Sequence, residues 1–113
     1  MLAKAELNIN PEDNAGTLFA NLATLGAELL LETLPKWVNG EIVPLAQNET
    51  EATYAPMLKK EEELIDWQDD AEKIFWQIRS LAPEISAYTY FKGKRLKIGA
   101  SALRDGEFNV PGM

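Results

Sequence analysis

The sequence predicts a mixed α/β fold in which a strand and two paired helices precede a linker, and a helix and a β-hairpin follow it. Three observations predict this order. Apolar and polar residues alternate over residues 1–9, leucines recur at spacings of three and four over residues 18–29, and an aromatic segment meets an alternating one at Lys92-Gly93. A period of two is typical of a half-buried strand, and the leucine spacing is typical of one helical face.

The first helix is predicted to begin soon after the opening strand. The pair Asn10-Pro11 supplies an N-cap and a first helical residue, and two acids follow where the helix dipole favours them. Gly26 is expected to divide the apolar run into two helices, the second over about residues 27–38. The pair Asn39-Gly40 supplies its C-cap. The apolar stripe consists of Leu18, Leu22, Leu25 and Leu29.

Residues 41–57 change in character and are predicted to form a linker. They include a polar, acidic stretch without periodicity at residues 47–51. Residues 58–63 are too charged for a core, because Lys59 and Lys60 stand beside three glutamates. We expect a short solvated helical turn there.

The next helix is predicted to be capped by Asp66 or Asp69 and to stop at Pro83, since proline cannot continue the backbone ladder. Trp67 is expected to pack against its first turn. The predicted buried face consists of Ala71, Ile74, Phe75 and Ile78. Core packing is the default expectation for the tryptophans, which are Trp37, Trp67 and Trp76.

A β-hairpin is predicted next. Residues 88–91 are rich in strand formers, residues 95–98 alternate, and Lys92-Gly93 supplies a tight turn in which Gly93 takes a positive φ. The pleat places Arg95 and Lys97 on one face, opposite Leu96 and Ile98. Residues 105–112 are expected to form a loop.

The composition limits the available chemistry. The chain has no cysteine, which excludes disulfides and thiolate nucleophiles, and no histidine, the usual general base near neutral pH. No uninterrupted run approaches the roughly 18 to 20 apolar residues of a membrane span. Residues 1–6 show no basic region followed by an apolar block, as a secretory signal would. These features fit a cytosolic protein that does not bind membranes.

Charge is distributed unevenly along the chain. The net charge of −7 divides into −11 over residues 1–72 and +4 over residues 73–113. The acidic total argues against nucleic acid, and DNA is not an expected partner. The asymmetry nevertheless indicates two parts with different surroundings, although ordinary solvated surface on both is the alternative explanation.

The hairpin is the best candidate for a binding site. Clustered cations suit phosphates, and the neighbouring Tyr90 and Phe91 can stack on bases. The alternative is an edge hairpin that lysines keep from aggregating. The four cations fall within six residues and are Lys92, Lys94, Arg95 and Lys97.

The acidic residues could indicate a divalent-metal site, but a solvated helix start explains them better. The calcium-loop spacing with its central glycine is absent, and so is a glycine-rich phosphate loop. No arrangement of polar residues suggests an acid/base pair or a catalytic triad. We therefore predict no metal. The acidic residues concerned are Glu61, Glu62, Glu63, Asp66, Asp69 and Asp70.

Several motifs follow one another in a distinctive order. They are Asn10-Pro11-Glu12-Asp13-Asn14-Ala15-Gly16-Thr17-Leu18 with Leu25-Gly26, then Gln47-Asn48-Glu49-Thr50-Glu51-Ala52-Thr53-Tyr54-Ala55, Lys60-Glu61-Glu62 with Ile65-Asp66-Trp67, Ile78-Arg79-Ser80-Leu81-Ala82-Pro83, Ala87-Tyr88-Thr89 and Val110-Pro111-Gly112. This order resembles the junction between the two domains of methionyl-tRNA formyltransferases. The family tends to carry a Pro-Trp-Pro-Gly-like stretch before Ala87, and this chain departs from it with Ala82-Pro83-Glu84-Ile85-Ser86.

The resemblance implies three segments. Residues 1–40 would end a Rossmann-like formyl-transfer domain, residues 41–57 would link the domains, and residues 58–113 would begin an OB-like C-terminal domain. The family transfers a formyl group from 10-formyltetrahydrofolate to the amino group of methionyl initiator tRNA, using an Asn, a His and an Asp of the first domain. None of the three can be placed here, so the resemblance implies a fragment or truncated reading frame that is inactive alone and lacks the folate pocket.

The resemblance also implies that cations within residues 58–113 contact tRNA. One alternative is a fragment of another folate-dependent formyltransferase, whose substrate is an amino sugar nucleotide. A non-catalytic module that binds a partner through its partly exposed apolar stripe is another. The oligomeric state is not predicted. The implied tRNA-binding residues are Lys92, Lys94, Arg95, Lys97, Lys59 and Lys60.

Overall fold

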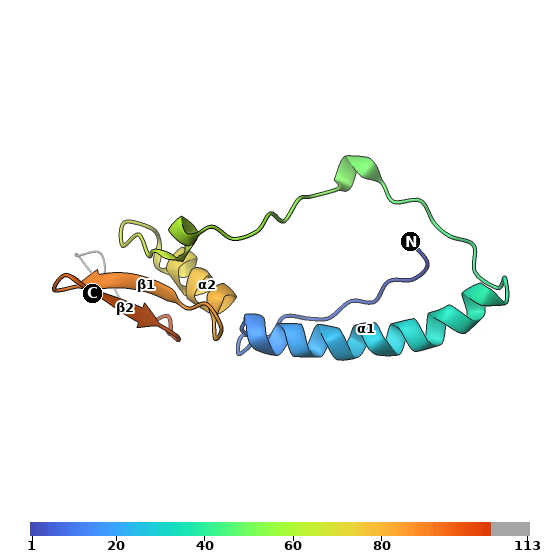
Figure 1. Cartoon of the computed structure of the whole chain (residues 1–113), viewed down its shortest axis with the longest axis horizontal. Helices are drawn as coiled ribbons and strands as arrows, with labels where there is room; N and C mark the ends of the chain where they lie inside the picture. The colour runs from blue at the N-terminus through green and yellow to red at the C-terminus, as the bar shows by residue number, and fades with distance from the viewer. Residues whose placement is uncertain (105–113) are drawn as a thin grey trace. The chain divides into compact units, whose positions relative to one another are not determined.

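The computed structural model describes residues 1–104, so the loop expected over residues 105–112, with its Val110-Pro111-Gly112 turn, lies outside the described residues. The predicted mixed α/β fold class is confirmed (Figure 1). The elements are α1 (Ala15–Val38), the short 3₁₀ helices η1 (Glu49–Glu51) and η2 (Lys60–Glu63), α2 (Ala71–Leu81), β1 (Ala87–Phe91) and β2 (Lys94–Ile98).

The described chain forms two compact units. The first consists of Met1–Pro11 and Leu18–Pro56, and the second consists of Glu12–Thr17 with the described residues from Met57 onward. The first turn of α1 therefore belongs to the second unit, while the rest of the helix belongs to the first.

Residues 1–9 do not form the predicted strand, and their side chains are all exposed. A half-buried strand needs a neighbouring strand for its backbone hydrogen bonds. The first unit offers instead one reciprocal contact, in which the Met1 ammonium donates to the Leu45 carbonyl at 2.7 Å and the Leu45 N–H donates to the Met1 carbonyl at 2.9 Å. The alternation alone therefore does not produce a strand here.

Helix α1 begins four residues later than predicted. Pro11 lies in a turn with Glu12, and the N-cap is Asn14, which exchanges reciprocal hydrogen bonds with Thr17. The Thr17 N–H donates to Asn14 Oδ1 and the Asn14 N–H donates to Thr17 Oγ1, both at 3.0 Å. These bonds satisfy backbone donors at the helix start, which the Asn10 cap was expected to do.

Helix α1 runs without interruption through Gly26, so the predicted division into two helices is wrong. An interior glycine destabilises a helix by only about 0.5–1 kcal/mol relative to alanine, and a helix of 24 residues tolerates this. The predicted C-cap is confirmed. Gly40 has a φ of 76°, its N–H donates to the Trp37 carbonyl at 3.0 Å, and the Glu41 N–H donates to the Lys36 carbonyl at 2.9 Å.

Much of the apolar surface of α1 is exposed, but most of it lies outside the predicted leucine stripe. Of the stripe, Leu22 is exposed, whereas Leu18, Leu25 and Leu29 are half-buried. Among the described residues, α1 is long and apolar enough to cross a membrane by length and composition alone. The sequence expectation considered only uninterrupted apolar runs, whereas small residues between the leucines also keep this helix apolar. Core helices of soluble proteins meet the same criterion. The exposed apolar residues of α1 are Phe19, Leu22, Leu30, Leu31, Leu34, Trp37 and Val38.

Residues 41–59 contain only the short helix η1, and η2 is the solvated turn predicted for residues 58–63. In η2 the Lys59 N–H donates to Glu62 Oε2 at 2.6 Å, which closes the first turn. The side chain of Gln77 on α2 donates to the Glu62 and Leu64 carbonyls at 2.8 and 3.0 Å. These two bonds hold the end of η2 against α2.

Helix α2 has Asp70 at its N-cap, not Asp66 or Asp69. Asp66 accepts instead from the Gln68 N–H at 3.0 Å, and Asp69 pairs with Lys73 at 2.7 Å. Each carboxylate thus has a local partner, a backbone N–H for Asp66 and a lysine side chain for Asp69. The hydrogen bond and charge of Asp69 raise the pKa of Lys73. Pro83 follows the helix end at Leu81, as predicted.

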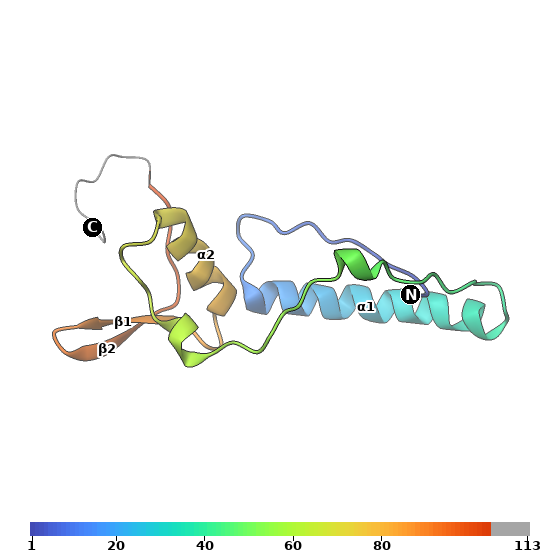
Figure 2. The same cartoon turned by 90° about the horizontal axis from the view of Figure 1, so that it is seen from above.

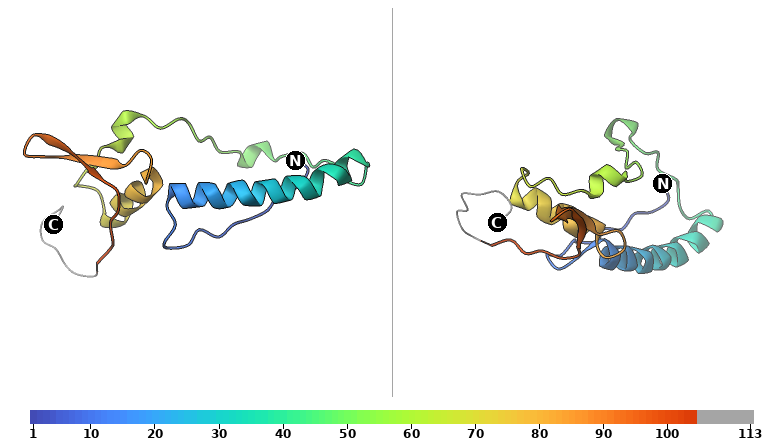
Figure 3. Two further views of the ribbon diagram at one scale, coloured as in Figure 1. Left: turned by 60° about the horizontal axis from the view of Figure 1, so that its bottom comes forward. Right: turned by 60° about the vertical axis from the view of Figure 1, so that its left-hand side comes forward.

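The core lies between α2, β1 and the segment after η2. Figure 3 shows α2 beside the hairpin, where Ile78 and Leu81 pack with Ile65 and Ala87. Ile74 and Phe75 are half-buried, but Ala71 is exposed because it lies at the helix start, away from β1. Of the three tryptophans, only Trp67 packs on this core; Trp37 and Trp76 are exposed, contrary to expectation, because no described element covers them.

The first turn of α1 is joined to the end of α2 within the second unit. The Arg79 side chain donates from Nε to the Asp13 carbonyl at 2.6 Å, and the Gly16 N–H donates to the Ala82 carbonyl at 3.3 Å. A Cβ atom on Gly16 would lie 2.6 Å from Cδ of Pro83. Only glycine fits this approach without a shift of the backbone.

Candidate nucleic-acid interface

The predicted hairpin is confirmed, and its register defines two faces. Strands β1 and β2 are antiparallel, with Tyr88 opposite Lys97 and Tyr90 opposite Arg95. Opposed residues share a face of a sheet, so these four side chains lie together. The turn residues Lys92 and Gly93 both have positive φ, 49° and 75°, which matches the type I′ turn of a two-residue hairpin.

The other face of β1 belongs to the core. Ala87 is fully buried, and Trp67 donates from Nε1 to Thr89 Oγ1 at 2.8 Å. The segment after η2 also pairs with β1, since the Ile65 N–H donates to the Tyr88 carbonyl at 2.8 Å. These contacts hold the base of the hairpin, whereas its turn projects away from α2 (Figure 2).

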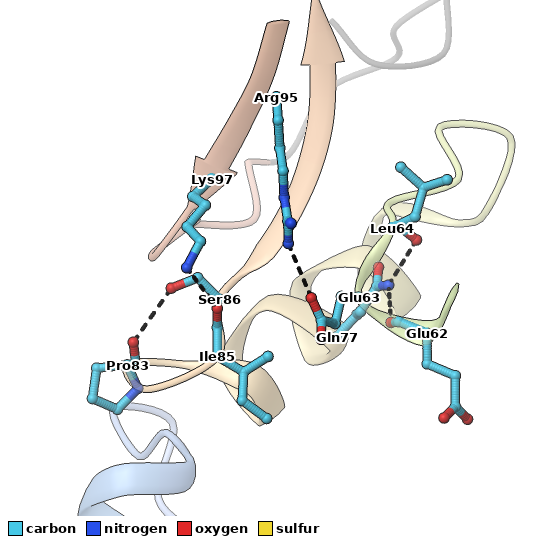
Figure 4. A network of polar contacts seen from close by, with 9 residues as sticks. All are labelled: Glu62, Glu63, Leu64, Gln77, Pro83, Ile85, Ser86, Arg95 and Lys97. Atoms are coloured by element: carbon cyan, nitrogen blue, oxygen red, sulfur yellow. Dashed lines mark hydrogen bonds and ion pairs between the residues drawn. The ribbon is translucent and has the colours of Figure 1, made fainter. Parts of the chain in front are cut away.

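Arg95 has two partners inside the second unit. Its Nη2 atom donates to Glu63 Oε2 at 3.0 Å (Figure 4). Its guanidinium carbon lies 3.8 Å from the centre of the Tyr88 ring. The Glu63 side chain is 19% exposed and that of Arg95 is 47% exposed. The positive charge of Arg95 is therefore largely compensated by Glu63 and is stacked on an aromatic ring.

Lys97 is also engaged within the second unit. Its Nζ atom donates to the Ile85 carbonyl at 3.3 Å, next to the bond from Ser86 Oγ to the Pro83 carbonyl (Figure 4). The Lys97 side chain thus contacts the loop between α2 and β1, at the base of the hairpin. Of the hairpin cations, Arg95 and Lys97 both form contacts that hold the hairpin to the rest of the second unit.

Lys92 and Lys94 lie at the tip and are exposed. Lys92 Nζ lies 5.3 Å from the centre of the Phe91 ring, and no carboxylate among residues 1–104 forms an ion pair with either lysine. Tyr90 and Phe91 are exposed beside them. The tip therefore combines free positive charge with open aromatic surface.

Lys59 and Lys60 are exposed at the start of η2, next to Glu61, Glu62 and Glu63. Within the described part of the chain, the ion pair that joins the η2 region to the hairpin uses Glu63 and Arg95, not these lysines. The structure thus brings together the four hairpin cations but shows no contact that adds Lys59 and Lys60 to them.

Sequence reasoning missed Glu63 and Tyr88 as partners of Arg95. The Tyr88 contact follows from the register, because the two-residue turn makes Tyr88 a diagonal neighbour of Arg95 on one face. The Glu63 contact has no local signal, since the two residues are 32 positions apart. In the described range, no three acidic side chains come together as a metal site would require.

Comparisons with known proteins agree with this architecture. Residues 57–113 match the formyl transferase C-terminal domain. This region is about half of the chain and includes η2, α2 and the hairpin. The chain therefore belongs to the formyl transferase family that this domain defines.

Matches to individual proteins identify a particular kind of formyl transferase among the relatives. The chain is 53% identical over 104 residues to a methionyl-tRNA formyltransferase of Dictyoglomus turgidum, a match that covers 92% of this chain and 33% of the relative. It is 46% identical over 111 residues to that of Bacillus licheniformis, covering 95% and 35%. It is 41% identical over 110 residues to that of Streptococcus suis, covering 97% and 35%. The chain thus spans about a third of the length of these relatives, and the resemblance stated from the sequence is confirmed.

Proposed function

We propose that this chain forms the tRNA-facing part of a methionyl-tRNA formyltransferase. Such an enzyme transfers a formyl group from 10-formyltetrahydrofolate to the amino group of methionyl initiator tRNA before translation initiation. The names of the bacterial relatives support this reaction, and the match of residues 57–113 to the C-terminal domain supports the position of the chain within such an enzyme. A role in translation initiation would place the protein in the cytoplasm.

The observation that carries the tRNA assignment is the hairpin. Phosphates are bound by clustered lysines and arginines, and exposed aromatic rings beside them can hold bases. Among the described residues, Lys92 and Lys94 with Tyr90 and Phe91 offer this combination. The overall charge of −7 opposes RNA binding at long range, so we expect a weak, local and salt-sensitive contact.

In this proposal the chain contributes to tRNA binding, and formyl transfer takes place in another part of the enzyme. Formyl transfer passes through a tetrahedral intermediate whose oxyanion needs placed hydrogen-bond donors. The folate site and these donors would belong to the part of the relatives that the match does not cover. In this proposal, residues 1–40 end the formyl-transfer domain, residues 41–57 link it, and residues 58–113 begin the C-terminal domain.

A filter-binding titration of the 113-residue chain with methionyl initiator tRNA tests the contact. We expect measurable binding at low salt that weakens steeply as salt rises, because each phosphate contact releases counterions. The double variant Lys92→Gln with Lys94→Gln should weaken binding and flatten the salt dependence. Lys4→Gln with Lys36→Gln removes the same charge from the first unit and should leave binding unchanged.

A turnover assay with the same tRNA and 10-formyltetrahydrofolate tests the division of labour. We expect no formyl transfer by the chain alone. Turnover by the purified chain would contradict this division, and equal binding by both double variants would reject the hairpin as the contact.

A further inference from the structure

We propose that the tip of the hairpin is a docking site for unpaired RNA nucleotides, in which Tyr90 stacks on a base and Lys92 and Lys94 contact the neighbouring phosphates. The inference rests on the proposed tRNA-binding function and deepens it. It names the part of the nucleic acid that is bound and the residues that bind it.

Tyr90 has both the exposure and the support that a stacking platform needs. Its side chain is 63% exposed, and its ring lies 5.8 Å from that of Tyr88 at an interplanar angle of 88°. Tyr88 is itself held by the Arg95 guanidinium at 3.8 Å. The Tyr90 ring is thus braced by a neighbouring ring that Arg95 contacts in turn. A braced ring loses less conformational entropy on binding than a free one.

Two cations flank the hairpin turn, close to Tyr90 in sequence. Lys94 is opposite Phe91, so its side chain starts on the other face of the ribbon from Tyr90, and its flexible stem has to pass the strand edge to reach a phosphate beside a base on Tyr90. Lys92 lies in the turn itself. Phe91 is 61% exposed and adds a second aromatic surface on the other side of the ribbon. Within residues 1–104 neither lysine forms an ion pair, so binding a phosphate breaks no internal salt bridge. The internal contact of Lys92 is with the Phe91 ring, whose centre lies 5.3 Å from its Nζ atom.

The remaining hairpin cations fit this site less well. Arg95 would have to leave Glu63 before pairing with a phosphate, and Lys97 would have to leave the Ile85 carbonyl. Lys97 also lies near the base of the hairpin, opposite Tyr88, whereas Arg95 lies next to Lys94 and opposite Tyr90. The structure thus separates four neighbouring cations into two that maintain the fold and two that are available.

An unpaired segment fits the tip better than a duplex does. In an RNA duplex the faces of the bases are stacked on each other, whereas loops and ends offer free faces to aromatic side chains. The two-stranded ribbon projects with its turn away from α2 (Figure 2). Tyr90 lies one pair before the last pair of this ribbon, so its exposed ring can reach such a base. Lysines without aromatic rings would bind the two forms of RNA through phosphates alone.

Fluorescence anisotropy of the 113-residue chain with labelled RNA tests the inference. The probes are a single-stranded RNA and a blunt duplex of the same sequence. We expect the single strand to bind more tightly. Tyr90→Leu should weaken that binding about 5- to 100-fold, the range expected for losing one base–aromatic stack. The slope of the salt dependence should stay unchanged, because no phosphate contact is lost.

Matched variants separate stacking from charge and from folding. Tyr90→Phe keeps the ring and should bind as the original chain does. Tyr54→Leu removes a tyrosine that is 99% exposed in the first unit and should have no effect. Lys94→Gln should weaken binding of both probes and reduce the salt slope by about one phosphate contact. Circular dichroism shows that each variant keeps its fold, and if Tyr90→Leu does not, Tyr90→Ile replaces it.

The possible failures are distinguishable. A chain that binds tRNA but binds the single strand no better than the duplex, or that tolerates Tyr90→Leu, overturns the stacking site and leaves the proposed function standing. A folded chain that binds neither tRNA nor the single strand at low salt overturns both.

Discussion

Arg95 donates a hydrogen bond to Glu63 across 3.0 Å, although 32 positions separate the two residues in the chain. Because Arg95 also stacks on Tyr88, this contact joins η2, β1 and β2 at one point. A residue that looked like part of a basic patch in the sequence therefore helps to hold the hairpin to the rest of its unit.

A double-mutant cycle measures this contact. We expect Arg95→Gln and Glu63→Gln to be coupled by about 0.5–1 kcal/mol in the free energy of unfolding in urea, a value kept low because the Arg95 side chain is partly solvated. The matched cycle uses Lys73→Gln and Asp69→Asn, a more exposed local ion pair at the start of α2, and should give weaker coupling. A coupling of zero between Arg95 and Glu63 would show that the pair contributes nothing to the fold.

The small core should be sensitive to any cavity. Ile78 is 2% exposed between α2 and β1, and Ile78→Ala should lower the free energy of unfolding of the second unit by about 2–5 kcal/mol. Leu31→Ala removes a side chain of the same size that is 76% exposed and should change it by less than about 0.5 kcal/mol. Thermal unfolding followed by near-UV circular dichroism reports both. Equal effects would contradict this placement of the core.

Two glycines should respond in opposite directions to alanine. Gly93 has a φ of 75°, so Gly93→Ala should destabilise the hairpin by about 1–2 kcal/mol. Gly26 lies inside α1, and a Cβ there would meet no atom within 4 Å, so Gly26→Ala should stabilise the helix by about 0.5–1 kcal/mol. Chemical denaturation gives both values. A loss of stability in Gly26→Ala would contradict the continuous helix and support the division at Gly26 that the sequence predicted.

Acid should weaken α1 in part through Glu32. Lys36 donates to Glu32 Oε1 at 2.7 Å, and this hydrogen bond, with the positive charge, lowers the pKa of Glu32. A carboxyl group whose pKa is lowered by folding stabilises the folded state at pH values above 4.5, its ordinary pKa. This stability is lost as the pH falls through the folded-state pKa. Helical ellipticity should therefore decline at acid pH, less so in Glu32→Gln. Glu28→Gln, without a described ion pair, should leave the decline unchanged.

Local signals accounted for the parts of the fold that sequence reasoning predicted. The turn at Lys92-Gly93, the helix end before Pro83 and the Gly40 cap each depend on the backbone preferences of one or two residues. The strand over residues 1–9 failed because a strand depends on a partner elsewhere, which alternation does not reveal. The Asp66 cap failed because its carboxylate had a nearer donor, the Gln68 N–H.

The candidate site divides in the same way. The clustering of the hairpin cations follows from a short stretch of sequence and from the pleat. Their availability does not, because it depends on Glu63 and the Ile85 carbonyl, which approach only when η2 and the loop before β1 fold against the hairpin. Sequence spacing therefore identified a basic ribbon, while tertiary contacts distinguished the cations that have internal polar partners, Arg95 and Lys97, from Lys92 and Lys94.

The close approach of Gly16 to Pro83, together with the bond from Arg79 to Asp13, has a consequence for proteolysis. Because the first turn of α1 packs with residues beyond 57, a protease that cuts the exposed segment between 41 and 56 would sever the backbone without freeing the second unit from its N-terminal piece. The two peptides would copurify as a nicked complex, and complementation between separately expressed halves would require residues 12–17 on the N-terminal half.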